Sequence, residues 1–153
     1  MNNRIYRLIS MACVIVVLAS ISFSANATLS TITVAAGSTG TSSEKPYITG
    51  TNKSTFNVSM NYFCFDGYST NVAPSGSPTI KVTPYRYVTS SGSAALQQAS
   101  ATLGFSCGAS PSSWYDEAYL YSGFGLVGDR MVIRSSSTYK SKGYVAQFNW
   151  YFS

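Results

Sequence analysis

The chain has 153 residues, of which ten are Lys or Arg, five are Asp or Glu and none is His. This length suits one ordinary domain with one core, and the small excess of basic residues argues against a nucleic-acid-binding surface, which needs many phosphate contacts. The lack of His removes the commonest general base and a principal zinc ligand, so the usual catalytic triads and His-containing metal sites are excluded.

The segment 1–27 has the three parts of a secretory signal peptide. Arg4 and Arg7 give it a basic start, an apolar run follows, and Ala25–Ala27 supply an A-x-A cleavage site. The apolar run is shorter than the roughly 20 residues that a membrane-spanning helix needs. We therefore expect a signal peptide at 1–27 and a single domain at 28–153 that is secreted, periplasmic or at the cell surface. No integral membrane segment is expected after cleavage.

The rest of the chain alternates apolar and polar residues with a period of two, which is typical of β-strands. We predict strands at 30–36, 54–65, 79–88, 99–107, 114–121, 130–135 and 143–152. The clearest apolar stripes are Phe56, Val58, Met60, Tyr62 and Cys64, and Ala99, Ala101, Leu103, Phe105 and Cys107. The connecting segments are rich in Gly, Ser, Pro and Asn, which favour turns.

Three segments depart from this pattern. The stretch 37–45 is rich in Gly and Ser, and we expect it to be a mobile arm. Pro84 has no backbone N–H to donate, which predicts that the middle of 79–88 is an edge or a bulge. Only 93–99 has a helix-favouring composition, for one or two turns.

Short strands separated by turns predict an all-β fold, a small antiparallel β-sandwich of the immunoglobulin-like or jelly-roll-like kind, with a small β-barrel as the alternative. Cys64 and Cys107 are the two cysteines that follow the expected cleavage site. An even number of cysteines in an exported chain predicts a disulfide, between neighbouring strands or across two facing sheets. Such a bridge is expected to stabilise the fold by about 4 kcal/mol.

Several patterns resemble catalytic motifs without the residues that make them work. The stretch 123–128 matches G-x-G-x-x-G, but the residues after it predict a strand and not the helix that a dinucleotide site needs. Ser106 lies in a G-x-S-x-G pattern with no His to serve as its base. Asp116 and Glu117 are adjacent, so on a strand they point to opposite faces and form no carboxylate pair. We expect neither an enzyme, nor a cofactor, nor a metal site.

Two groups of residues are candidate binding sites. Tyr115, Tyr119 and Tyr121 share one face of the predicted strand 114–121 and suit stacking on sugars or contact with a protein. The alternative is that these tyrosines only pack as cross-strand pairs. Arg130 and Arg134 share a strand face and suit anionic envelope polymers or lipid headgroups. The alternative for them is a solvated face or protection of an edge strand.

The last residues resemble parts of two families. Gly143–Ser153 is similar to the closing strand of chaperone–usher fimbrial subunits, with its glycine, its alternating apolar run and its aromatic next-to-last residue, here Phe152. That resemblance implies an assembly subunit that polymerises by strand addition. The aromatic ending 148–152 is similar to lactococcin-type bacteriocins, although their His-containing core is absent, and it implies an antimicrobial protein.

The expectation from the sequence as a whole is a secreted, non-enzymatic binding or surface-interaction module. Its expected partner is an extracellular glycan, an envelope polymer or a protein, and not a nucleic acid. A fimbrial or other assembly subunit and a secreted antimicrobial protein are the alternatives. The sequence predicts no oligomeric state.

Overall fold

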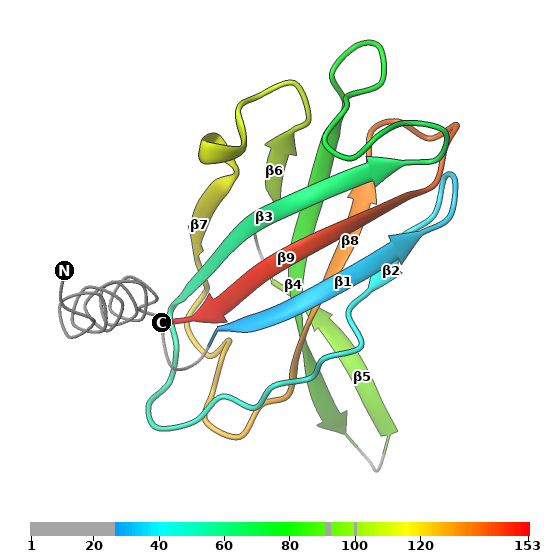
Figure 1. Cartoon of the computed structure of the whole chain (residues 1–153). Coiled ribbons are helices and arrows are strands. Elements are labelled where there is room, and N and C mark those ends of the chain that lie inside the picture. The colour runs from blue at the N-terminus through cyan, green and yellow to red at the C-terminus, as the bar shows by residue number, and fades with distance from the viewer. Residues whose placement is uncertain (1–26, 91–92, 100) are drawn as a thin grey trace, which may run out of the picture.

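The computed structural model describes residues 27–90, 93–99 and 101–153 (Figure 1). The expected signal peptide, apart from Ala27, lies outside these residues. Within them the protein is all-β, with two antiparallel sheets packed face to face as a small sandwich, which confirms the predicted fold class. No helix in the described part of the chain is long and apolar enough to cross a membrane.

Each sheet is built from strands that are far apart in the sequence (Figure 1). The front sheet has the order β1-β9-β3-β7, formed by Thr28–Val34, Tyr144–Phe152, Thr55–Phe65 and Tyr115–Tyr119. The back sheet has the order β2-β8-β4-β5, formed by Gly40–Thr41, Met131–Ser137, Thr79–Ser90 and Ser93–Gln98, and β6 (Leu103–Ser106) also pairs with β4. One 3-10 turn, η1 (Pro111–Ser113), precedes β7.

The core lies between the two sheets and follows the predicted alternation most closely in β9. Every second residue of that strand, from Tyr144 to Phe152, is buried, and those between them are half-buried on the outer face. The back sheet contributes Ile80 and Ile133, both fully buried. The rings of Phe105 and Phe148, one from each sheet, lie 6.3 Å apart across the interior. Burial of this aromatic and aliphatic surface is the main force that holds the two sheets together.

The disulfide predicted between Cys64 and Cys107 is wrong, because a β-bulge interrupts the alternation in β3. Met60 pairs with Phe148 and Tyr62 pairs with Gln147, so Asn61 is an extra residue. Beyond the bulge the two faces of the strand exchange: Phe63 and Phe65 are buried, whereas Tyr62 and Cys64 are only half-buried. Cys64 therefore lies on the outer face of the front sheet and Cys107 lies in the core, and both are free.

The two thiols are expected to differ sharply in reactivity. Burial raises the pKa of Cys107 to about 12, so its thiol stays protonated and shielded at mildly alkaline pH. Cys64 is half-exposed. A thiol-specific reagent should modify Cys64 in the native protein and Cys107 only after denaturation, and Cys64→Ser should abolish the native reaction. A denatured, unreduced protein without any reactive thiol would contradict the arrangement.

The edge or bulge predicted at Pro84 is wrong, because Pro84 lies in β4, an inner strand of the back sheet. The sheet accommodates the proline because the pairing on one side of β4 is interrupted at this residue. β4 has β8 on one side and β5 and β6 in succession on the other. β6 pairs with residues up to Val82 and β5 with residues from Tyr85 onward. The Pro84 carbonyl accepts a hydrogen bond from Ala99 N at 3.0 Å on that side. Because the N and O of one residue point the same way in an antiparallel strand, the missing N–H faces this interruption.

The helical turns predicted over 93–99 are wrong, because Ser93–Gln98 forms strand β5. β5 is the second arm of a hairpin with β4, in which Ser90 pairs with Ser93 and Tyr85 with Gln98. The weak helical preference of a few residues is overridden by ladder hydrogen bonds to an adjacent strand.

The stretch 37–45, expected to be a mobile arm, contains β2 and is hydrogen-bonded to the back sheet. Ser42 is buried, its N donates to Ile133 O at 2.9 Å, and its hydroxyl accepts from Ile133 N at 3.2 Å. A Cβ atom at Gly40 would lie 2.5 Å from the Ile32 side chain, so only glycine lets β2 approach β1 this closely. The edges of the two sheets meet here.

Candidate functional site

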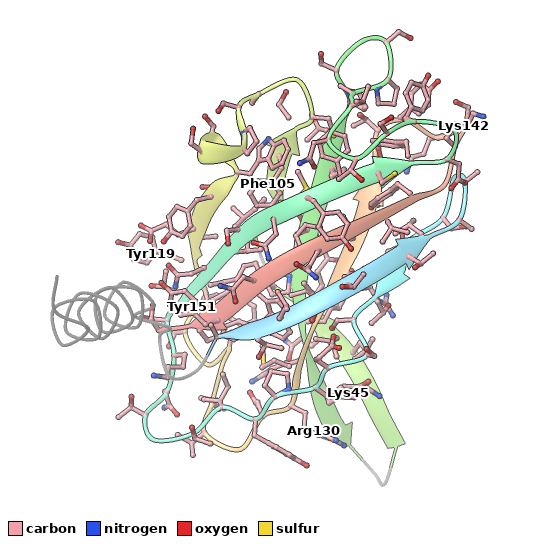
Figure 2. All side chains as sticks on the ribbon, in the orientation of Figure 1. Lys45, Phe105, Tyr119, Arg130, Lys142 and Tyr151 are labelled. Atoms are coloured by element: carbon pink, nitrogen blue, oxygen red, sulfur yellow. The ribbon has the colours of Figure 1, made fainter. Side chains whose placement is uncertain are left out.

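The tyrosines predicted on 114–121 lie on the outer side of β7, as the alternation indicates. Trp114 fixes the strand, because its ring is buried against Phe63 with centroids 5.3 Å apart and its Nε1 donates to Ser106 O at 2.9 Å. Tyr115 and Tyr119 are consequently turned outward, with exposed fractions of 53% and 80%. Both belong to β7, which is an edge strand of the front sheet, and Figure 2 shows Tyr119 at this edge.

The neighbouring strands extend this face with amides and further tyrosines. Asn57 of β3 pairs with Tyr151 of β9 on one side and with Glu117 of β7 on the other. Ser59, one pair further along, lies between Asn149 and Tyr115. We call this outer face of the front sheet the tyrosine–amide surface; it consists of Asn61, Tyr62, Tyr115, Glu117, Tyr119, Gln147, Asn149 and Tyr151. Asn57 is buried beneath it.

Hydrogen bonds hold many of these side chains in fixed positions. Tyr115 Oη donates to Asn57 Oδ1 at 2.9 Å, and Asn61 Nδ2 donates to Gln147 Oε1 at 3.1 Å. Gln147 Nε2 in turn donates to Thr31 Oγ1 at 3.2 Å. Such bonds pre-order the polar groups, which lowers the entropic cost of ordering them when a ligand binds.

The surface is almost uncharged. The four strands of the front sheet contain no Lys or Arg, and their only acidic residues are Asp116 and Glu117. Burial raises the pKa of Tyr115, and the nearby Tyr151 and Glu117 raise it further. The Tyr115 hydroxyl therefore stays protonated well above neutral pH, which maintains its hydrogen bond to Asn57 Oδ1.

The predicted arginines lie on the opposite side of the molecule, so the structure does not bring the two candidate groups together. Arg134 of β8 stacks on the Tyr85 ring of β4 at 4.7 Å, and Arg130 stacks on Tyr47 at 5.0 Å. Lys45 lies over the Tyr87 ring at 5.6 Å. The outer face of the back sheet is therefore basic and aromatic, whereas that of the front sheet has no basic residue and carries the exposed carboxylate of Glu117.

Sequence reasoning missed the tyrosines that support these cations. Tyr85 and Tyr87 are out of phase with the buried Ile80 and Val82, and that change of phase after Pro84 was the available signal that they point outward. Tyr121, the third predicted tyrosine, lies just beyond β7 and packs edge-on against Phe124 with centroids 5.2 Å apart. It borders the tyrosine–amide surface and is not part of its register.

A pocket of about 490 Å³ opens beside Arg130 and is lined also by Tyr47, Tyr87, Leu126 and Asp129. Arg86 closes one side, with its guanidinium 3.1 Å from Asp129 Oδ2. In the described part of the chain, no three Cys, Asp or Glu side chains are grouped as a metal site.

Comparison of the chain with family models, curated proteins and solved structures finds no match. The geometry of the surfaces is therefore the basis for a functional assignment. One feature of the fold bears on the fimbrial resemblance. β9, the strand that carries it, is hydrogen-bonded to β1 on one side and to β3 on the other, so the pairing positions beside it are filled.

Proposed function

We propose that the protein is a non-enzymatic carbohydrate-binding module whose tyrosine–amide surface binds a neutral, extended glycan. The observation that supports this proposal is the combination of exposed tyrosine rings with ordered amides on a sheet face that has no basic residue. Tyrosine offers a large contact area and a hydroxyl at modest entropic cost, and amides both donate and accept hydrogen bonds.

The shape of the surface favours a chain over a single sugar. Tyr115 and Tyr119 are four positions apart on one face of β7, about 14 Å along a strand. A ligand that contacts both rings has to be longer than one monosaccharide. Binding is expected to be insensitive to salt, because the strands of the front sheet have no cation with which an acidic polymer could pair.

The test is a glycan array followed by titration with the neutral polysaccharide that binds best. We expect Tyr119→Ala to weaken binding about tenfold, because the proposal makes this ring a principal contact for the glycan. Since Tyr119 is 80% exposed, its removal should not disturb the core. Tyr47→Ala is the matched control, since Tyr47 is 57% exposed and its ring lies beside Arg130 and is not part of the tyrosine–amide surface. A lack of binding to any neutral glycan at millimolar concentration, or equal losses in both variants, would refute the proposal.

The two alternatives from the sequence remain predictions. A fimbrial or other assembly subunit would have to polymerise through an edge strand, such as β7 or β5, and not beside β9, because β9 has a partner on each side. An antimicrobial role would require action on membranes or on the cell wall.

A further inference from the structure

A second surface lies at the end of the sandwich where β8 begins, around the loop 121–129. Leu126 and Val127 stand next to each other at the tip of this loop, and their exposed fractions are 39% and 54%. Removal of these two aliphatic side chains from water lowers the free energy, so binding to a partner that buries them is favoured. We call Leu126 and Val127 the apolar tip.

The apolar tip is held rigidly by hydrogen bonds. Leu126 N donates to Asp129 Oδ2 and Val127 N donates to Asn52 Oδ1, each at 3.0 Å. Gly128, with a φ of 88°, completes the turn and donates to Ile48 O at 2.8 Å. The tip is therefore pre-formed and has little conformational freedom to lose on binding.

The base of the loop is fixed as firmly as its tip. Phe124 is 1% exposed and lies 5.6 Å from the Arg86 guanidinium, which also bonds to Asp129. A Cβ atom at Gly125 would lie 2.8 Å from Lys53 O, so the loop packs directly on the backbone at Lys53, in the segment that leads into β3. These contacts direct the apolar tip away from the core.

Basic residues gather around the apolar tip. Arg130 follows the loop and lies over the Tyr47 ring, and Lys53 lines a pocket together with Tyr47. Lys45 lies over Tyr87, which lines the same pocket as Leu126. The nearby acid Asp129 is neutralised, because its carboxylate is bound by Arg86 and by Leu126 N. The surroundings of the tip therefore have a net positive charge and include an exposed aromatic ring, Tyr47.

We infer that this surface binds an anionic lipid bilayer. The apolar tip would enter the headgroup region, Tyr47 would lie at the interface, and Arg130, Lys45 and Lys53 would contact lipid phosphates. A soluble polyanion would use the same cations but would leave Leu126 and Val127 in water. The combination of an apolar tip with a basic surround therefore favours the bilayer.

The two proposals use separate surfaces and stand independently. Figure 2 shows Arg130 and Lys45 apart from Tyr119 and Tyr151. A chain bound to a membrane through the apolar tip would leave the tyrosine–amide surface free for its glycan.

The experiment is co-sedimentation of residues 28–153 with vesicles of phosphatidylcholine, with and without one third phosphatidylglycerol. We expect binding only to the anionic vesicles, and weaker binding at high salt. Replacing both Leu126 and Val127 by Ser should reduce binding at least about tenfold. Arg130→Gln should reduce it about fivefold, the share of one basic residue near a charged membrane.

Val72→Ser with Lys142→Gln is the matched control, because Val72 is an exposed aliphatic residue in the loop after β3 and Lys142 is an exposed cation. Figure 2 shows Lys142 at the other end of the sandwich. This control should bind as the parent does. Unchanged thermal unfolding of every variant shows that folding is intact. The inference is overturned if anionic vesicles do not sediment the protein, or if the Ser variant binds normally. The inference is also overturned if the Ser variant binds both soluble polyphosphate and anionic vesicles as tightly as the parent does. That result would show that the basic residues bind a soluble polyanion without the apolar tip.

Discussion

Replacement of Phe63 and Phe65 together by Ala is expected to prevent the domain from folding, because both rings are fully buried on the core face beyond the bulge. Each buried Phe contributes about 3–5 kcal/mol relative to Ala. The loss of two is of the order of the whole stability of a small domain, about 5–15 kcal/mol. Circular dichroism and urea unfolding of the purified variant measure the result.

Deletion of Asn61, in contrast, is expected to leave the domain folded. Met60 and Tyr62 would become adjacent and would keep their partners Phe148 and Gln147, so Phe63 and Phe65 would stay in the core. The matched control keeps the residue count and changes only the side chain. Asn61→Ser removes the hydrogen bond from Asn61 to Gln147 but leaves the bulge in place. Because Asn61 is exposed, we expect a loss of at most about 1 kcal/mol in unfolding free energy. A deletion variant that fails to fold would contradict this register, as would a variant with Ala at both Phe63 and Phe65 that is as stable as the parent.

The bulge also shows where sequence periodicity fails. The alternation in β9 is unambiguous, because polar and small residues separate Phe148 from Trp150 and Ala146. In β3 four large apolar residues follow one another from Tyr62 to Phe65, so either phase would bury apolar groups. The choice is made by pairing with a strand about 80 residues away. The disulfide was predicted from the phase of the alternation alone, so the change of phase at the bulge made that prediction wrong.

The candidate site was predictable only within single strands. The outward direction of Tyr115 and Tyr119 followed from the alternation in their own strand. Their neighbours did not, because Asn57 is 58 residues from Tyr115 and approaches it only through pairing of β3 with β7. The stacking of Arg134 on Tyr85 similarly depends on pairing of β8 with β4. Sequence reasoning can place residues on a face, but it cannot join faces that long-range pairing assembles.

Replacement of Trp150 by Ala is the second change with a large expected effect. Trp150 is fully buried in β9, and its ring lies 6.4 Å from that of Phe56 and 5.8 Å from that of Phe152. Because β9 is bonded on both sides, the cavity cannot collapse readily, and we expect a loss of about 3–5 kcal/mol. Denaturant unfolding monitored by far-UV circular dichroism gives the difference.

Two further variants separate the causes of that loss. Trp150→Phe fills most of the cavity but removes Nε1, which donates to the buried Ser30 hydroxyl at 2.9 Å, so about 1–3 kcal/mol should still be lost. Tyr151→Ala, one position along on the outer face, should cost about 1 kcal/mol and should instead weaken glycan binding. If Tyr151→Ala destabilised the protein as much as Trp150→Ala, the assignment of the inner and outer faces of β9 would be wrong. The tyrosine–amide surface would then have to be placed on the other side of the front sheet.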